Sequence, residues 1–439
     1  MGTFSSESGE GVIHDATFSD AACRALLRCI ECAETIPTRK GTLQGLPGAA
    51  LAEARGPADT PLTPRRSVAE QSNSSILFGG NLILKLFRRQ QPGPNPDCEI
   101  AEFFAAHSNF GAVPPFAGSI EYCPDGEEAY TLAMLQGLVQ NESDGWKWTL
   151  EELDRYYEDR ARVPFPANTG LDDLPVLARS SGEPHALARE HLGLSLESAA
   201  ALGRRTAEMH LALAGGGGIS AFEPERLEPD ALRDVAAEFE EHAARVLDQL
   251  KANFSSLPDE VVESAGLVLS RKRGLVARFH GLRNSQIHAL RTRIHGDYHL
   301  GQVLRTRNDY VILDFEGEPA RSLTERRAKH SPLKDVAGML RSFSYAGHTA
   351  LRNYTLRRPD AREHLEQWTH LWETATTAEF LRAYRAVAGD APFLPADLGD
   401  FQMLLDAYLL DKALYELRYE LDNRPEWIRI PIAGILSMV

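Results

Sequence analysis

The segment of residues 294–317 constrains this chain more than any other, because it sets acidic and amide side chains around two short apolar runs. Its first half contains the run His-Gly-Asp-Tyr-His-Leu-Gly-Gln, which places Asp297 near the start of a loop and Gln302 five positions later. The second half is the apolar run of residues 311–313, which is followed at once by Asp314. The pattern predicts a polar loop and then a short strand that ends on a carboxylate.

These side chains match what phosphoryl transfer to a hydroxyl requires. The reaction needs a carboxylate that orients the attacking hydroxyl and accepts its proton, and it needs ligands that hold Mg²⁺ across the nucleotide phosphates. Asp297 suits the first task. Asp314 and the amide oxygen of Gln302 suit the second, because Mg²⁺ prefers hard oxygen ligands. The alternative is a polar turn without chemistry. We predict an ATP- and Mg²⁺-dependent phosphotransferase with Asp297 as its catalytic base.

A lysine in an upstream strand is consistent with this chemistry. Apolar runs at residues 75–78 and 81–87 flank a Gly-Gly pair, which predicts a β-hairpin, and Lys85 lies in its second strand. An isolated strand lysine is usually a solvent-facing residue, but in a chain with the predicted catalytic loop we favour contact with nucleotide phosphates. We expect Glu99, on the following helix, to be its ion-pair partner, with Glu102 as the alternative.

Further nucleotide contacts are predicted from a loop. The run Glu-Gln-Ser-Asn-Ser-Ser at residues 70–75 offers hydroxyl, amide and backbone N–H donors that suit phosphate oxygens, so we expect contacts from Ser72 and Ser74. The chain has neither GxxxxGK[ST] nor a complete GxGxxG, which excludes the P-loop classes at the level of motifs.

Periodicity divides the chain into a strand-rich part and a larger helical part. Apolar runs bounded by glycine and proline predict strands over about residues 70–135, and apolar residues at three- and four-residue spacing predict helices afterwards. This order favours a mixed α+β fold with a small nucleotide-binding lobe, residues 66–140, and a mainly helical lobe, residues 141–439. Residues 1–65 carry one predicted helix, and a stretch dense in glycine and proline over 41–66 is interpreted as a linker or an irregular crossing.

Composition narrows the remaining classes. The 62 acidic residues exceed the 47 basic ones, and the net charge of -15 argues against general nucleic-acid binding, which draws most of its affinity from a basic face. The chain begins without a charged-then-apolar signal sequence and has no run of about 18 apolar residues, so we expect no membrane segment and a cytoplasmic location. Cys29 and Cys32 form a CxxC pair, which we interpret as small buried side chains and not as a zinc or redox site.

The motifs at residues 295–317 resemble the aminoglycoside-phosphotransferase-like branch of the protein-kinase-like superfamily. The catalytic loop of that branch carries HGD with an asparagine five residues after the aspartate, and here Gln302 takes the place of the asparagine. The metal-binding Asp-Phe-Gly of the superfamily corresponds to Asp314-Phe-Glu-Gly. The resemblance implies a bilobal kinase fold with a small β-rich N-lobe and a larger helical C-lobe. It also implies that residues 133–136 form the hinge strand, in which Met134 and Gln136 meet the adenine.

Within that superfamily, the flanking segments are similar to bacterial maltokinases. The similarity is carried by residues 70–75, 84–89, 92–96, 133–136, 313–319, 334–343 and 412–425, and by Trp427. It implies transfer of the ATP γ-phosphate to the anomeric hydroxyl of maltose, which gives maltose 1-phosphate for α-glucan (glycogen) synthesis. Some maltokinases are fused to trehalose synthase, so association or fusion with that enzyme is also implied.

The resemblance further implies a sugar site and a shortened N-terminal region. Family members carry a β-rich cap before the nucleotide lobe, so residues 1–65 are interpreted as a remnant of that cap and a linker. Two alternatives stay open, namely a kinase for another sugar such as glucosamine and a non-catalytic pseudokinase subunit. Glu316 is assigned either to a second Mg²⁺ or to the sugar. The residues expected to contact the sugar are His295, Asp335, Arg341, Tyr419 and Glu420.

Overall fold

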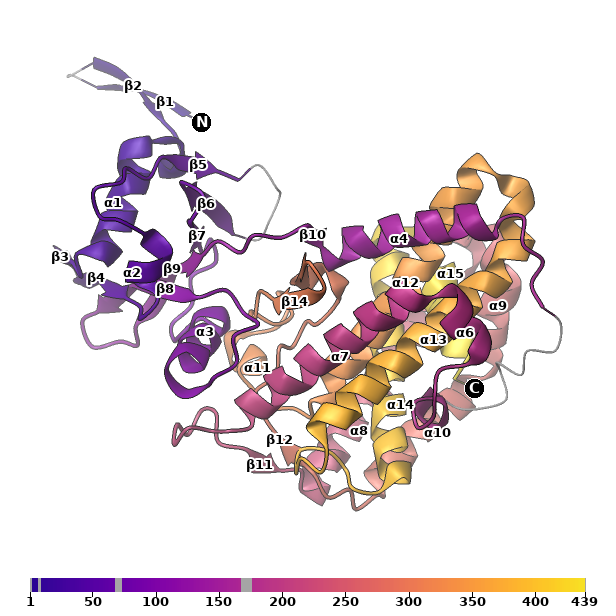
Figure 1. Cartoon of the computed structure of the whole chain (residues 1–439). Coiled ribbons are helices and arrows are strands. Elements are labelled where there is room, and N and C mark those ends of the chain that lie inside the picture. Colours follow the sequence, from indigo (N-terminus) through magenta and orange to yellow (C-terminus); the bar gives the residue numbers. More distant parts are fainter. Residues whose placement is uncertain (1, 7–8, 68–72, 167–175, 439) are drawn as a thin grey trace. The chain divides into compact units, whose positions relative to one another are not determined.

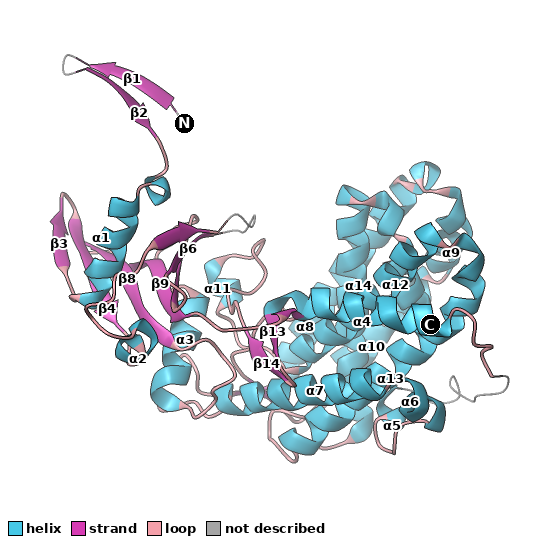
Figure 2. Cartoon of the chain, turned by 45° about the horizontal axis from the view of Figure 1, so that its top comes forward, coloured by secondary structure: helices cyan, strands magenta, loops and turns pink. Residues whose placement is uncertain are grey.

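The computed structural model describes residues 2–6, 9–67, 73–166 and 176–438 (Figure 1). The chain forms two compact units. The N-terminal unit comprises Met1–Gln140 and Val311–Arg327, and the helical unit comprises Asn141–Tyr310 and Ala328–Val439. The fold is mixed α+β, as predicted, because the long strands belong to the N-terminal unit and helices dominate the other (Figure 2).

The N-terminal unit is built on one seven-stranded sheet in the order β3-β4-β8-β9-β7-β6-β5, and all neighbouring strands run antiparallel. The hairpin predicted around the Gly-Gly pair is confirmed. Strands β6 and β7 pair with Phe78 opposite Leu82, and Gly79 has a φ of 61°, which favours glycine. The strands are β3 (Thr35–Thr38), β4 (Gly41–Pro47), β5 (Pro64–Arg66), β6 (Ser74–Phe78), β7 (Leu82–Leu86), β8 (Phe116–Pro124) and β9 (Tyr130–Gly137).

Helices complete this unit. They are α1 (Asp20–Glu31), α2 (Leu51–Arg55), α3 (Pro96–His107) and α11 (Leu323–Arg326), and a separate hairpin joins β1 (Gly2–Ser6) to β2 (Gly9–Ile13). Apolar side chains of α1 pack with those of the sheet in one core cluster, which includes Leu27, Ile30, Ile76, Phe78, Leu82, Leu84 and Leu135. Of the CxxC pair, Cys29 is buried as predicted, but Cys32 is exposed because it caps the end of α1.

The stretch of residues 41–66 is not a linker, and that interpretation was wrong. Strand β4 pairs with β3 on one side and with β8 on the other, and β5 pairs with β6. The glycines reflect close packing. A Cβ at Gly45 would lie 1.9 Å from the carbonyl oxygen of Cys29, so α1 crosses β4 with no room for a side chain. That residues 1–65 are a remnant of a cap stays a hypothesis.

The helical unit contains the long amphipathic helices predicted from the spacing of apolar residues. Helices α7 and α13 cross closely, since a Cβ at Gly203 would lie 2.3 Å from the carbonyl oxygen of Phe380. None of the helices in the described part of the chain combines the length and apolar character needed to cross a membrane. The helices are α4 (Gly145–Arg160), α5 (Val176–Arg179), α6 (Ala186–His191), α7 (Gly193–Leu213), α8 (Pro229–Ala252), α9 (Asp259–Ser270), α10 (Lys272–Arg283), α12 (Leu333–Arg357), α13 (Arg362–Ala388), α14 (Leu398–Asn423) and α15 (Arg429–Leu436).

The segment singled out in the sequence forms the predicted loop and strands. A short 3₁₀ turn (Leu300–Gln302) follows the HGD loop and leads into β13. Strand β14 then brings the chain to Asp314, two residues beyond its end, in the N-terminal unit. The short strands of this part of the chain are β10 (Ser143–Asp144), β11 (Glu225–Arg226), β12 (Leu290–Arg291), β13 (Val303–Thr306) and β14 (Asp309–Ile312).

Candidate active site

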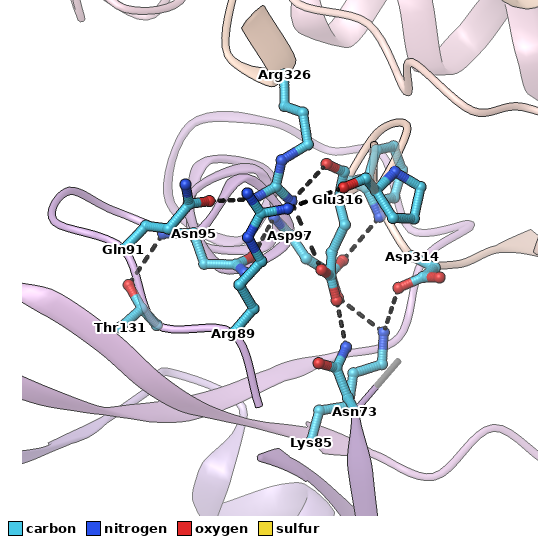
Figure 3. A network of polar contacts seen from close by, with 12 residues as sticks. Asn73, Lys85, Arg89, Gln91, Asn95, Asp97, Thr131, Asp314, Glu316 and Arg326 are labelled. Atoms are coloured by element: carbon cyan, nitrogen blue, oxygen red, sulfur yellow. Dashed lines mark hydrogen bonds and ion pairs between the residues drawn. The ribbon is translucent and has the colours of Figure 1, made fainter. Parts of the chain in front are cut away.

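Lys85 is the centre of a charged cluster in the N-terminal unit (Figure 3). It lies in β7, an interior strand of the sheet, and its ammonium is 2.7 Å from Asp97 Oδ2 and 3.1 Å from Asp314 Oδ1. Burial alone lowers the pKa of this lysine, but the two carboxylates outweigh burial and hold the pKa well above its usual value. Lys85 is therefore a fixed cation between two carboxylates, and not a solvent-facing strand residue.

The predicted partner of Lys85 is corrected from Glu99 to Asp97. Both residues lie in the first turn of α3, which Asn95 caps. Residues two positions apart point in directions about 200° apart around a helix, so only one of them can face β7. Asp97 does so, whereas Glu99 accepts two hydrogen bonds from Arg327, at 2.8 and 3.0 Å.

The sequence carried a signal for this assignment. Asp97 lies on the same helix face as Ile100, Ala101 and Phe104, at the spacings of three, four and seven residues that mark a buried face. Glu102, the alternative partner, is exposed. Of the acidic residues on α3, the one that shares the apolar face is expected to point toward the sheet. The side chain of Asp97 is accordingly only 1% exposed.

The turn after β14 gathers the carboxylates that suit a metal ion. Carboxylate oxygens of Asp97, Asp314 and Glu316 all lie within 4.8 Å of one another. Asp97 is occupied by Lys85 and by the backbone N–H of Phe315, 2.9 Å from its Oδ1. The side chains of Asp314 and Glu316 are 33% and 15% exposed, respectively, and remain accessible. Asp314 and Glu316 are therefore the residues that would hold Mg²⁺, through the hard oxygens this ion prefers.

The charge balance of the cluster fits a cation. Burial, together with the nearby Asp314 and Asp97 carboxylates, raises the pKa of Glu316 to about 7, against opposing contributions from Asn73 and Lys85. Asn73 donates a hydrogen bond to Glu316 Oε1. The carboxylates thus carry more negative charge than Lys85 neutralises, and a divalent cation would relieve this excess. Sequence reasoning had left Glu316 open between a metal and the sugar.

In the helical unit, Asp335 fixes the HGD loop. Its Oδ2 accepts the backbone N–H of His295 at 2.7 Å, and its Oδ1 accepts that of Gly296 at 2.9 Å. His210 Nε2 lies 3.2 Å from Asp335 Oδ2, and His210 Nδ1 lies 2.9 Å from the hydroxyl of Tyr384. Burial raises the pKa of Asp335, but the hydrogen bond and charge of His210, together with His295 and the loop N–H, bring it below the usual value. Asp335 is therefore an ionised, buried anchor of the loop.

This anchored loop presents the predicted base, Asp297, to solvent. The side chain of Asp297 is 23% exposed, and Lys412 Nζ lies 3.6 Å from its Oδ1 while His299 Nε2 lies 4.0 Å from its Oδ2. The carboxylate is thus accessible and lies near two basic side chains. Gln302 ends the 3₁₀ turn, where its backbone N–H bonds to the carbonyl of His299 at 2.9 Å. Its role as a metal ligand stays a prediction.

Four of the five predicted sugar contacts are corrected to structural roles. His295 and Asp335 are buried and belong to the loop anchor just described. Arg341 is buried and ion-paired with Glu416 at 2.6 Å, so it joins α12 to α14. These groups thus have partners within the protein, which hold the loop and join the helices.

Glu420 is the fourth of these residues, because it is buried and accepts hydrogen bonds from Tyr345 and Arg424. Tyr419, in contrast, is 46% exposed, and the guanidinium of Arg424 lies 5.2 Å above its ring. An exposed ring of this kind suits a sugar face, so Tyr419 alone of the five stays a candidate contact. Helix spacing could not distinguish these residues, because charged and aromatic residues on one face are equally compatible with a core ion pair.

The predicted nucleotide contacts belong to the N-terminal unit. Ser72 lies outside the described residues. The hydroxyl of Ser74 accepts a hydrogen bond from Arg88 at 3.1 Å. Met134 and Gln136 are buried in β9, which pairs with β7 and β8. The contact of Lys85 with nucleotide phosphates, like those of Ser74, Met134 and Gln136 with the nucleotide, stays a prediction.

Comparisons with known proteins find two glucosamine kinases among the relatives of this chain. No protein-family model matches the chain. Glucosamine kinase of Streptacidiphilus jiangxiensis is 24% identical over 435 residues, which make up 98% of this chain and 84% of that protein. Glucosamine kinase of Mycolicibacterium smegmatis (strain ATCC 700084 / mc(2)155) is 24% identical over 379 residues, 85% of this chain and 79% of that one.

A solved structure matches the fold. Glucosamine kinase in complex with glucosamine, ADP and inorganic phosphate superposes with a TM-score of 0.68 at 21% identity, over 100% of this chain and 87% of that one. The chain therefore has the kinase-like fold of that protein. The expected assignment to maltokinase in particular, and the association with trehalose synthase, receive no support from these comparisons.

Proposed function

We propose that this chain is an ATP-dependent sugar kinase, with glucosamine as the first acceptor to test. The observation that carries the proposal is the ion-paired cluster of Lys85 with Asp97 and Asp314, because a lysine held between carboxylates next to a metal-type turn is suited to nucleotide phosphates. The similarity to glucosamine kinases along nearly the whole chain supports the same class.

Each residue has a defined task in this proposal. Lys85 contacts phosphate oxygens of ATP, and Asp97 keeps Lys85 extended toward them. Asp314 and Glu316 would hold Mg²⁺, and this ion would supply positive charge that neutralises the phosphates. Asp297 accepts the proton of the acceptor hydroxyl as that oxygen forms its bond to the γ-phosphorus and the bond to the ADP oxygen breaks. The products are a phosphorylated sugar, ADP and one proton.

The acceptor rests on the comparisons and not on the geometry. The relatives found are named glucosamine kinases, which favours an amino sugar. Maltose is the second candidate, because residues 412–425 and the motifs around Asp314 are similar to maltokinases. With maltose the product would be a sugar 1-phosphate, as the maltokinase similarity implies.

The test is ADP release with Mg·ATP across glucosamine, maltose and glucose, with the product identified by ³¹P NMR. We expect glucosamine to give the highest rate. A preference for maltose would select the second candidate. No ADP release with any sugar, together with no rise in melting temperature on adding Mg·ATP, would favour the non-catalytic alternative, since a ligand that binds the folded state must stabilise it. Asp297→Asn should abolish turnover, with the exposed Asp360→Asn as its control.

A further inference from the structure

Arg326 contacts the metal-type turn from the side opposite to Lys85 (Figure 3). It lies in the short helix α11, and its side chain is only 8% exposed. Its Nη1 donates to the backbone carbonyl of Glu316 at 3.1 Å and lies 3.6 Å from Glu316 Oε2. Its Nη2 donates to Gln91 Oε1 at 3.1 Å. A buried guanidinium therefore links both the backbone and the side chain of Glu316 to the connection between β7 and α3.

The turn that Arg326 contacts requires such support. Asp314 has a φ of 65° and Gly317 a φ of 70°, so both lie in the left-handed region. For a residue other than glycine this conformation costs about 1–2 kcal/mol, and it persists only where neighbouring groups hold it. Two side chains do so here, because Asp97 accepts the N–H of Phe315 and Arg326 donates to the carbonyl of Glu316. The backbone between the two candidate metal ligands is thus held at both of its polar ends.

We propose that Arg326 is a positioning residue for the divalent cation, which keeps Glu316 turned toward the site that it shares with Asp314. The inference rests on the proposed function for the identity of the site. The inference goes beyond the proposed function, because it assigns a role to Arg326, which contacts neither nucleotide nor sugar in that proposal. Groups that orient metal ligands are worth about 10- to 100-fold in metal affinity.

Electrostatics alone predicts the opposite effect, which makes the inference testable. Removing the positive charge of Arg326 leaves Glu316, Asp314 and Asp97 with less opposing charge, and by Coulomb's law this would tighten cation binding. Loss of positioning would weaken it. The direction of the change in affinity therefore separates the two effects without reference to its size.

The experiment measures Mn²⁺ binding to the full chain without nucleotide, by electron paramagnetic resonance of the free ion. The variant Arg326→Met is expected to bind Mn²⁺ about tenfold more weakly than wild type. Arg326→Lys, which keeps the charge but loses the forked geometry, is also expected to bind more weakly. Arg327→Met is the matched control, because Arg327 follows directly in the chain and holds α3 through Glu99 without an ion pair to Glu316.

The outcomes are distinct. Mn²⁺ affinity that is unchanged or higher in Arg326→Met, in protein with a wild-type melting temperature, would overturn the inference. Equal weakening in Arg327→Met would also overturn it, because general loosening of the segment would then be the cause. Wild-type protein that binds no Mn²⁺ would overturn both the inference and the metal assignment. Wild-type protein that binds Mn²⁺ but releases no ADP with any sugar would overturn the proposed function and leave the role of Arg326 intact.

Discussion

Replacing Asp335 with asparagine is the sharpest test of how the helical unit holds its catalytic loop. The carboxylate accepts two backbone N–H groups, those of His295 at 2.7 Å and Gly296 at 2.9 Å, and contacts His210 at 3.2 Å. Asparagine keeps one acceptor oxygen but sets an NH₂ group against the second N–H. One charge-assisted hydrogen bond is lost and one buried donor is left unmet, which together cost about 2–4 kcal/mol.

That cost converts into a rate of amide exchange. Since about 1.4 kcal/mol corresponds to a factor of ten, the loop should open roughly 30- to 700-fold more often in Asp335→Asn. Hydrogen–deuterium exchange followed by mass spectrometry, on a peptide that covers residues 294–302, measures this directly. Asp360→Asn, an exposed aspartate on the same unit, is the control. Unchanged exchange in this peptide would refute the assignment of Asp335 as the anchor.

The same residue predicts a dependence on pH. The pKa of Asp335 is lower in the folded protein than its usual value, so its ionisation stabilises the fold above the unfolded pKa of about 3.9. This contribution is lost as the pH falls below that value toward the lower folded pKa. Wild type should therefore lose stability in acid more steeply than Asp335→Asn, as measured by urea unfolding between about pH 5 and pH 3. Parallel profiles would contradict an ionised Asp335.

Two further predictions follow from packing and charge. Gly45→Ala should destabilise the N-terminal unit by about 2 kcal/mol or more, because the added Cβ would meet the Cys29 carbonyl. A Cβ added at Gly80 meets nothing within 4 Å, so Gly80→Ala should be neutral. Equal melting temperatures for the two variants would contradict the packing of α1 on β4. Lys412→Met removes the cation 3.6 Å from Asp297 Oδ1 and should lower kcat about tenfold at an unchanged melting temperature. Unaltered turnover would show that Lys412 does not contribute to the active site.

Local patterns in the sequence were enough to predict some of these features. The hairpin of β6 and β7 followed from two apolar runs around Gly79-Gly80, because turn chemistry acts over a few residues. The loop that carries Asp297 and the strand before Asp314 followed from residue order alone. Lys85 could be singled out because the predicted catalytic loop favoured a phosphate-binding lysine in an upstream strand.

Other features depended on contacts that spacing does not encode. The glycines of residues 41–66 resembled a loop, but Gly45 is required by the helix that crosses it, about fifteen residues away in the chain. The choice between Asp97 and Glu99 depended on which face of α3 meets the sheet. Arg341 and Glu420 resembled a sugar site because the sequence lists charges without saying which of them neutralise one another in the core. Burial, in each case, decided the role.

The central claim is that Lys85, held by Asp97 and Asp314, makes this chain an ATP-dependent kinase. It is tested most directly by the initial rate of ADP release with Mg·ATP and the best sugar of the panel, compared among wild type, Asp97→Asn and Glu99→Gln. The account predicts a loss on the order of 100-fold or more in Asp97→Asn, at most a small change in Glu99→Gln, and folded protein in each case by melting temperature. Full activity in Asp97→Asn, or no ADP release from wild type with any sugar, would contradict it.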